Sequence, residues 1–198
     1  MPYSKEHKAA TRKKILESAI RLFSTRGFDQ VSIDDLMQDA GLTRGAFYVH
    51  FDNKKAVYAK AIIAGAKKSR IMQQKPTDIS QQEWIHDLLF GYLSEAHVNQ
   101  EISPCPLAFL VTDIANNEYE VKATYTRMFK HLNKSIQVQL KDTNDCNAAD
   151  IMATTAMMIG AVAISRALND DKTTQQLLQC CRQRAQVLLK LEKPKRQT

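Results

Sequence analysis

The feature that most constrains this fold is a close series of helix start and stop signals in the first quarter of the chain. Ser32, Thr43 and Asn53 are suited to cap helix N-termini, and Gly41 suits the tight turn between the first two helices. These residues leave room for two short helices before a longer one that begins at Asn53. Two short helices joined by a glycine turn are the outline of a helix-turn-helix, whose second helix enters the major groove of DNA.

The remainder of the chain also predicts helices. Apolar residues recur at intervals of three and four, as at Ile15, Ala19, Leu22 and Phe23 in the first helix. The 198 residues include only 6 glycines and 5 prolines, which disfavours a turn-rich β fold. Beyond residue 75 we expect five helices, at about 80–98, 106–116, 118–141, 147–168 and 173–191. The expected fold class is all-α, with about nine helices.

The positive charge of the chain is concentrated near its N-terminus. The net charge is +7, and residues 1–70 hold 14 basic and 7 acidic residues, whereas residues 71–198 hold 14 of each. All of the excess therefore lies in the first third, which indicates either a surface that binds a polyanion or a solvated lysine-rich helix face. Contact of Lys5, Lys8, Arg12 and Lys13 with the DNA backbone or minor groove is as consistent with the sequence as simple solvation.

Several other classes of protein lack support in the sequence. No nucleophile elbow, phosphate-binding loop or metal-ligand spacing is present, so we expect no enzyme, no metal and no cofactor. No apolar run reaches the roughly 20 residues of a membrane span, and the first residues lack the apolar segment of a signal peptide. The four cysteines form no C-x-x-C pair. We therefore expect no membrane partner and a cytoplasmic chain with reduced thiols.

The stretch after Ser32 resembles the TetR family of bacterial transcriptional repressors. The matching residues run Gly41-Leu42-Thr43-Arg44-Gly45-Ala46-Phe47-Tyr48-Val49-His50-Phe51-Asp52-Asn53-Lys54. Val57 stands where that family usually has leucine. The resemblance is strong over about residues 8–60. It implies a three-helix DNA-binding domain at 1–52 and an effector-binding and dimerisation domain at 53–198, connected by a helix at 53–75.

Within this motif the residue types predict two faces. Leu42, Phe47 and Phe51 are expected to pack inward against the first helix, near Phe23 and Phe28. The remaining polar positions are expected to face DNA, and the resemblance implies the same; the predicted contacts are Ser32, Thr43, Arg44, Gly45, Tyr48, His50 and Lys54. For Arg44, reading of a base edge and contact with a phosphate remain equally open. His50 could instead pack or cap locally.

The C-terminal two thirds are expected to form a homodimer. A single short helix buries too little surface for specific DNA recognition, whereas two half-sites about one helical turn apart suffice. The helices at 147–168 and 173–191 are the candidates for the interface, because Ala153, Ala156 and Gly160 would let helices approach closely. The alternative is that these two helices only close the core of one chain.

Candidates for an effector site are weaker, because aromatic residues at helical spacing are also typical of a plain core. The predicted lining residues are Trp84, Phe90, Tyr92, Cys105, Phe109, Tyr125 and Met128, with His131 nearby. They favour an apolar or aromatic small molecule. Cys105 precedes Pro106, which suits the first position of a helix, so Cys105 is expected at the N-cap, where the helix dipole lowers a thiol pKa.

The Cys-Pro-Leu-Ala string at Cys105 also resembles one branch of the TetR family, some of whose members sense electrophiles or oxidants through such a cysteine. That branch often has glycine before the cysteine, where this chain has Pro104. An inert buried thiol is the alternative. The resulting hypothesis is a dimeric repressor that binds a palindromic operator and is released by a small molecule or a reactive electrophile. The alternative function is a non-specific architectural protein that binds nucleic acid.

Overall fold

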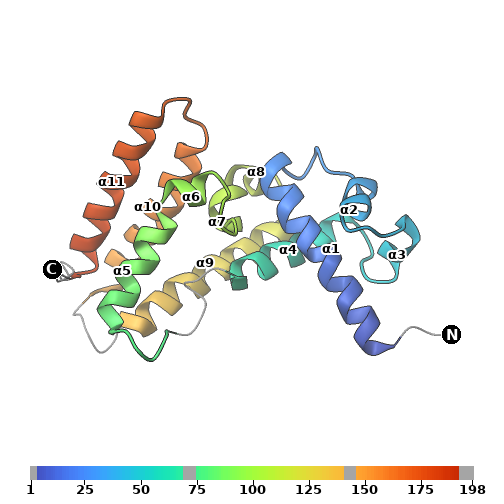
Figure 1. The fold of residues 1–198 in the computed structure, drawn as a ribbon, viewed down its shortest axis with the longest axis horizontal. Coiled ribbons are helices and arrows are strands. Elements are labelled where there is room, and N and C mark those ends of the chain that lie inside the picture. Colours follow the sequence, from blue (N-terminus) through green and yellow to red (C-terminus); the bar gives the residue numbers. More distant parts are fainter. Residues whose placement is uncertain (1–3, 69–74, 141–145, 192–198) are drawn as a thin grey trace. The chain divides into compact units, whose positions relative to one another are not determined.

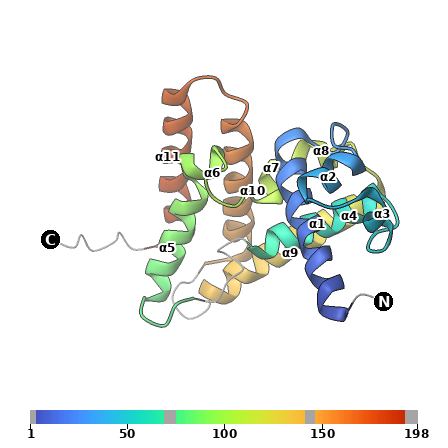
Figure 2. The ribbon, with the colours of Figure 1, turned by 45° about the vertical axis from the view of Figure 1, so that its right-hand side comes forward.

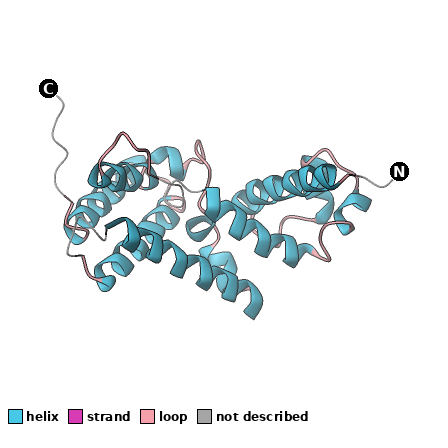
Figure 3. Ribbon diagram, turned by 90° about the horizontal axis from the view of Figure 1, so that it is seen from below, coloured by secondary structure: helices cyan, strands magenta, loops and turns pink. Residues whose placement is uncertain are grey.

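The computed structural model describes residues 4–68, 75–140 and 146–191. All regular structure in these ranges is helical, as Figures 1 and 3 show. The helices are α1 (Lys5–Arg26), α2 (Ile33–Asp39), α3 (Arg44–Tyr48), α4 (Lys54–Lys68), α5 (Gln81–Tyr92), α6 (Glu95–Val98), α7 (Pro106–Phe109), α8 (Val111–Ala115), α9 (Tyr119–Leu140), α10 (Ala148–Ser165) and α11 (Asp171–Leu188). The predicted all-α fold class is confirmed.

Within the described ranges, eleven helices replace the nine that the sequence predicts, because two expected helices are each divided. The helix expected at 80–98 breaks at Leu93, and the Ser94 hydroxyl then caps α6 by accepting from the His97 backbone N–H at 3.2 Å. The helix expected at 106–116 breaks at Leu110 into α7 and α8. The end of the helix expected at 53–75 lies outside the described residues from position 69 to 74.

The chain forms two compact units that are not continuous in sequence. The first comprises Met1–Lys67 and Pro104–Arg127, and the second comprises Lys68–Ser103 and Met128–Thr198. Helix α4 and the segment that holds α7 and α8 therefore pack with the predicted DNA-binding region. The sequence suggested a division at residue 52, because the motif that ends there is visible along the chain. Residues 104–127 belong to the first unit because of tertiary packing, which the sequence does not show.

The first unit has an aromatic core where α1, α4 and the turn after α1 meet. The Tyr58 ring lies edge-on to Phe23 at 4.8 Å between centroids and 4.9 Å from Phe28. Tyr58 and Phe23 are fully buried. Helix α1 is capped at its C-terminus by Gly27, whose positive φ of +79° glycine adopts without strain. The core thus fixes the point at which the chain leaves α1 for the helix-turn-helix.

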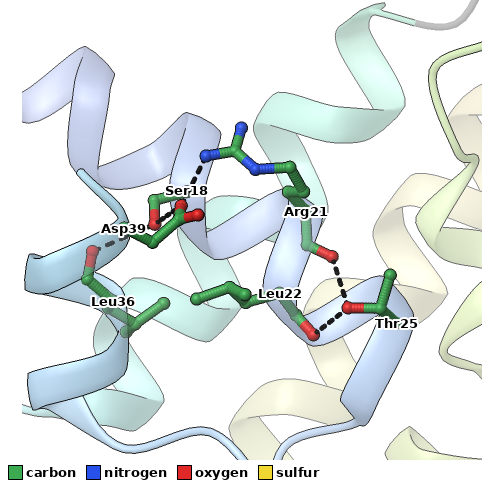
Figure 4. Close-up of polar contacts among 6 residues, drawn as sticks. All are labelled: Ser18, Arg21, Leu22, Thr25, Leu36 and Asp39. Atoms are coloured by element: carbon green, nitrogen blue, oxygen red, sulfur yellow. Dashed lines mark hydrogen bonds and ion pairs between the residues drawn. The ribbon is translucent and has the colours of Figure 1, made fainter.

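A polar junction joins α1 to α2 beside this core (Figure 4). The Ser18 hydroxyl lies 3.0 Å from the Leu36 carbonyl oxygen and also contacts the Asp39 carboxylate, which pairs with Arg21. Asp39 is the last residue of α2, where a negative charge opposes the helix dipole. Arg21 and Ser18 offset that cost while they fix the two helices against each other.

The second unit contains α10 and α11, which pack side by side (Figure 2), together with α5, α6 and the C-terminal half of α9. His97 of α6 is 2% exposed, and its Nδ1 lies 2.7 Å from the Tyr92 carbonyl oxygen. Burial lowers the pKa of His97, so its imidazole is neutral at pH 7. This histidine is therefore a core residue that holds α6 against the end of α5.

The α1–α2 junction yields a stability prediction. Ser18→Ala removes a buried hydroxyl that serves two acceptors, and it should lower the free energy of unfolding by about 1–2 kcal/mol. Thr25→Ala is the matched control, because the Thr25 hydroxyl bonds only to carbonyls of its own exposed helix turn, and the change should cost about 0.5 kcal/mol or less. Urea unfolding followed by circular dichroism measures both. Equal losses in the two variants would contradict the role of Ser18.

Candidate nucleic-acid interface

Local hydrogen bonds build the turn between α2 and α3. The Leu42 N–H donates to the Met37 carbonyl at 2.8 Å, and the Gly41 N–H donates to the Gln38 carbonyl at 3.0 Å. This pattern requires a left-handed residue after the helix, and Gly41 supplies it with a φ of +66°. Helix α2 begins with a capping box between Ser32 and Asp35. The expected cap at Ser32 and the glycine turn are thus confirmed.

The inner face of α3 is buried as the motif predicted. Phe47 is fully buried, Phe51 is 5% exposed, and their ring centroids lie 5.8 Å apart. Leu42 is half-buried at the turn. Because α3 has only five residues, it cannot persist by its own helical hydrogen bonds, and this apolar contact is what holds it in place.

The outer face of α3 carries most of the predicted DNA contacts. Tyr48 is 55% exposed and the Arg44 side chain 59%, and Thr43 and Gly45 are also exposed. A Cβ built on Gly45 would meet no atom within 4 Å, so the fold itself does not require glycine there. The structure brings these four residues together on one short helix and its N-cap. The open space at Gly45 is available to a partner surface.

Two basic residues near α3 hold the fold together. The Lys54 ammonium donates to the Phe28 carbonyl at 2.8 Å and lies 4.1 Å from the centre of the Phe28 ring. Arg12 donates to the His50 carbonyl at 2.6 Å and lies 4.2 Å from the centre of the Phe51 ring. The sequence presented Lys54 as a candidate DNA contact and left Arg12 open between DNA contact and solvation. Lys54 retains two further N–H donors, so its contact with a phosphate stays a prediction.

The other polar side chains predicted to contact DNA differ in their exposure and in the hydrogen bonds that they already make. The Ser32 hydroxyl is exposed but accepts the Asp35 N–H in the capping box at 3.0 Å. The Thr43 side chain makes no such capping bond at the start of α3. His50 is half-buried just after α3. Burial first, and then the nearby charges of Arg12 and Lys8, lower the pKa of His50.

The seven predicted effector residues are divided between the two units. Cys105, Phe109 and Tyr125 belong to the first unit, and the other four belong to the second: Trp84, Phe90, Tyr92 and Met128. Cys105 is the N-cap of α7, followed by Pro106 in the first turn, as expected. The thiol is 4% exposed. The Tyr125 hydroxyl donates to the Leu107 carbonyl at 2.8 Å, and burial raises its pKa to about 12.

Three cavities in the second unit are lined by other residues. One of about 260 Å³ lies between α9 and α10, beside Phe129 and Ile151. A second of about 200 Å³ lies near Arg166 and Ser165, and a third of about 20 Å³ is lined by residues of α5, α9 and α10 and by Leu189. The seven predicted effector residues line none of these three, and their role in binding an effector stays a prediction.

Comparison with known proteins agrees with this geometry. Residues 15–61, from the middle of α1 to the middle of α4, match the profile of the bacterial regulatory proteins of the tetR family. Several solved TetR-family regulators share the fold over most of the chain. Residues 15–61 are thus similar to the DNA-binding region of TetR-family regulators.

Relatives of known role match only the N-terminal region. The chain is 35% identical over 51 residues to IcaR, the negative transcriptional regulator of the biofilm operon icaADBC, from Staphylococcus epidermidis. IcaR of Staphylococcus aureus matches at the same identity. The match covers 26% of this chain and only about a quarter of each IcaR chain, 28% and 27%.

The structural neighbours cover nearly the whole chain. A TetR-family regulator from Cytophaga hutchinsonii has a TM-score of 0.72 at 20% identity, covering 95% of this chain and 98% of its own. One from Agrobacterium tumefaciens has a TM-score of 0.72 at 19% identity, covering 89% and 98%. The reduced form of Escherichia coli NemR has a TM-score of 0.68 at 15% identity, covering 87% and 95%. At such identities these likenesses show the fold alone.

The structure adds residues that sequence reasoning missed. Val49 is 63% exposed beside Tyr48, and Asp34 of α2 pairs with Arg44. An apolar residue on the outer face could have been found from helical spacing, since Val49 follows Tyr48 and lies opposite Phe47. The Asp34–Arg44 pair spans ten residues and a turn, so no simple periodicity reveals it.

His50 gives a test by pH. Its lowered pKa makes it neutral at pH 7, and a DNA phosphate would favour the protonated form and raise that pKa. Affinity for DNA should therefore rise as the pH falls from about 7 to about 5.5, and the rise should be smaller in His50→Gln. Fluorescence anisotropy at constant ionic strength measures this, with His7→Gln as a control. An unchanged pH dependence in His50→Gln would remove His50 from the interface.

Proposed function

We propose that this protein is a dimeric transcriptional repressor that binds a palindromic DNA operator through α3 and is released by a small-molecule or electrophile signal. Repression is proposed because IcaR, which matches the N-terminal region, is a negative regulator. A cytoplasmic location, at the nucleoid when bound to DNA, follows from that role.

The observation that carries the proposal is the division of α3 into two faces. Its buried face, centred on Phe47, anchors the helix, and its exposed face presents Arg44, Gly45 and Tyr48 to solvent. A phenol, a guanidinium and a glycine that allows close approach suit a nucleic-acid surface, where phosphates accept hydrogen bonds and base edges accept from arginine. The excess positive charge of residues 1–70 supports the same partner.

The exposed face of α10 supports a dimer. The mean hydropathy of Ala148–Ser165 is 1.6, yet only 44% of the segment is buried. Its exposed apolar residues include Met152 and Ile164, which are 55% and 53% exposed, as well as Ala153 and Ala156. One side of α10 lies in the core beside α11, and the other is an apolar surface with small residues. A second copy of the chain would cover that surface and place two α3 helices on one operator.

The release signal is proposed to act through the predicted effector residues. An apolar or aromatic molecule would shift the population away from the conformation that binds DNA. An electrophile would instead act at Cys105, which begins α7 in the same compact unit as α3. Since Cys105 is 4% exposed, such a reaction requires local opening and would be slower than at the exposed Cys180.

A non-specific architectural role is the competing function. It accounts for the basic first third but gives no role to the second unit, which has its own core. The two functions differ in measurable ways. Non-specific binding weakens steeply as the salt concentration rises, and any unrelated competitor DNA displaces the protein.

The main test is selection of bound fragments from genomic DNA, which should return a palindromic sequence. On the selected operator, Tyr48→Ala should weaken all sequence variants alike, by roughly tenfold, because it removes a backbone contact. Arg44→Ala should relax the preference at particular bases, worth about 1–3 kcal/mol each. Uniform loss from both variants would reduce Arg44 to a phosphate contact, and absence of any sequence preference would overturn the proposed function.

The dimer has its own test. Ala156→Glu places an unpaired carboxylate on the exposed apolar face of α10 and should raise the dissociation constant of the dimer by about a hundredfold or more. Ala123→Glu, at an exposed position of α9, is the matched control and should leave association unchanged. Sedimentation velocity over a concentration series distinguishes them. A dimer that persists in Ala156→Glu would mean that α10 only completes the core of one chain.

The thiol hypothesis is tested by comparing operator affinity before and after treatment with N-ethylmaleimide or hypochlorite. If an electrophile is the signal, the wild-type protein and Cys180→Ser should lose affinity, whereas Cys105→Ser should retain it. Equal loss in wild type and Cys105→Ser would leave Cys105 as an inert buried thiol.

A further inference from the structure

An ion pair on the outer surface joins the first turn of α2 to the first residue of α3. The Arg44 Nη1 donates to Asp34 Oδ2, and the two side chains are 59% and 61% exposed. The partners come from different helices on either side of the Gly41 turn. This carboxylate therefore lies beside the side chain that the proposed function assigns to base reading.

The fold does not depend on this pair. Asp35, rather than Asp34, closes the capping box with Ser32 at the start of α2. Helix α3 is held by the buried Phe47 ring and by the backbone bonds of the turn. An exposed ion pair adds little to stability. Apart from its favourable charge in the first turn of α2, Asp34 acts on the orientation of the Arg44 guanidinium.

The remaining donors of Arg44 suit a guanine. A guanidinium has five N–H groups in one plane, and the contact with Asp34 occupies Nη1 only. The edge formed by Nε and Nη2 stays available, and two parallel donors match the O6 and N7 acceptors of guanine. A long side chain that is already oriented loses less conformational entropy on binding than one that is free.

We propose that Asp34 is a positioning residue that orients Arg44 for bidentate reading of a guanine in each half-site. This inference rests on the proposed function. It favours base reading over phosphate contact for Arg44, because the Asp34 carboxylate already occupies one terminal nitrogen of the guanidinium and leaves the paired donors that match a guanine. The Asp34 carboxylate repels phosphates as well, so it lowers affinity for unrelated DNA and raises the ratio of specific to non-specific binding.

The test uses the full-length protein and the operator selected from genomic DNA. Four variants are compared with wild type: Asp34→Asn, Arg44→Ala, the double variant, and Asp52→Asn, which removes the same charge at another exposed position of the first unit. Affinity is measured for the operator, for operators with each guanine of the half-site replaced in turn, and for unrelated DNA. Thermal unfolding of each variant is recorded alongside.

Wild type should prefer one guanine by about tenfold or more, and Asp34→Asn should lose most of that preference while its affinity for unrelated DNA stays equal or rises. Arg44→Ala and the double variant should show the same base profile, because Asp34 acts only through Arg44. Asp52→Asn should keep the wild-type profile. The melting temperature of Asp34→Asn should remain close to that of wild type.

Three results would overturn the inference. Asp34→Asn could keep the full guanine preference, or it could weaken every sequence equally with a lower melting temperature, which would mean a structural role. Asp52→Asn could change the profile as much as Asp34→Asn, which would mean a general charge effect. Each of these leaves the proposed function intact, whereas a wild-type protein without any sequence preference overturns the proposed function itself.

Discussion

The arrangement of the helices in the first unit depends on two hydrogen bonds that the Asp113 carboxylate accepts. Its Oδ1 accepts the Phe28 N–H at 3.1 Å, and its Oδ2 accepts the Tyr58 hydroxyl. One side chain of α8 therefore binds both the turn that follows α1 and the centre of α4. Burial and the bond to Asp113 raise the pKa of Tyr58, so the phenol stays protonated and donates at any physiological pH.

The same turn is held from its other side. The Phe28 N–H is bound by Asp113, its carbonyl is bound by the Lys54 ammonium at 2.8 Å, and its ring packs on Tyr58. Every polar group of this backbone position is satisfied within the first unit. Because α2 and α3 follow directly, the orientation of the helix-turn-helix against α4 and α8 is fixed at Phe28.

The sequence predicted those features that depend on near neighbours. The capping box at Ser32, the left-handed Gly41 and the N-cap positions of Thr43 and Cys105 all follow from residues within one helical turn. It missed the features that pair distant residues. Asp113 lies 85 positions from Phe28, and the roles of Lys54 and Arg12 in the fold depend on carbonyls 26 and 38 positions away. The spacing of apolar residues gives no information about such distant partners. In the second unit no recognised sequence motif supplies that information instead.

A close approach between α4 and α7 shows how the region of Cys105 connects to the DNA-binding surface. A Cβ built on Gly65 would lie 2.5 Å from Pro106 Cγ, so the proline ring fits against α4 only because residue 65 has no side chain. Pro106 directly follows Cys105, and α8 with Asp113 follows α7. Close-packed contacts are nearly incompressible, so a shift of one element moves its neighbour. A displacement of α7 would therefore be transmitted to α4 at Gly65 and to the Phe28 turn through Asp113, both of which hold the helix-turn-helix.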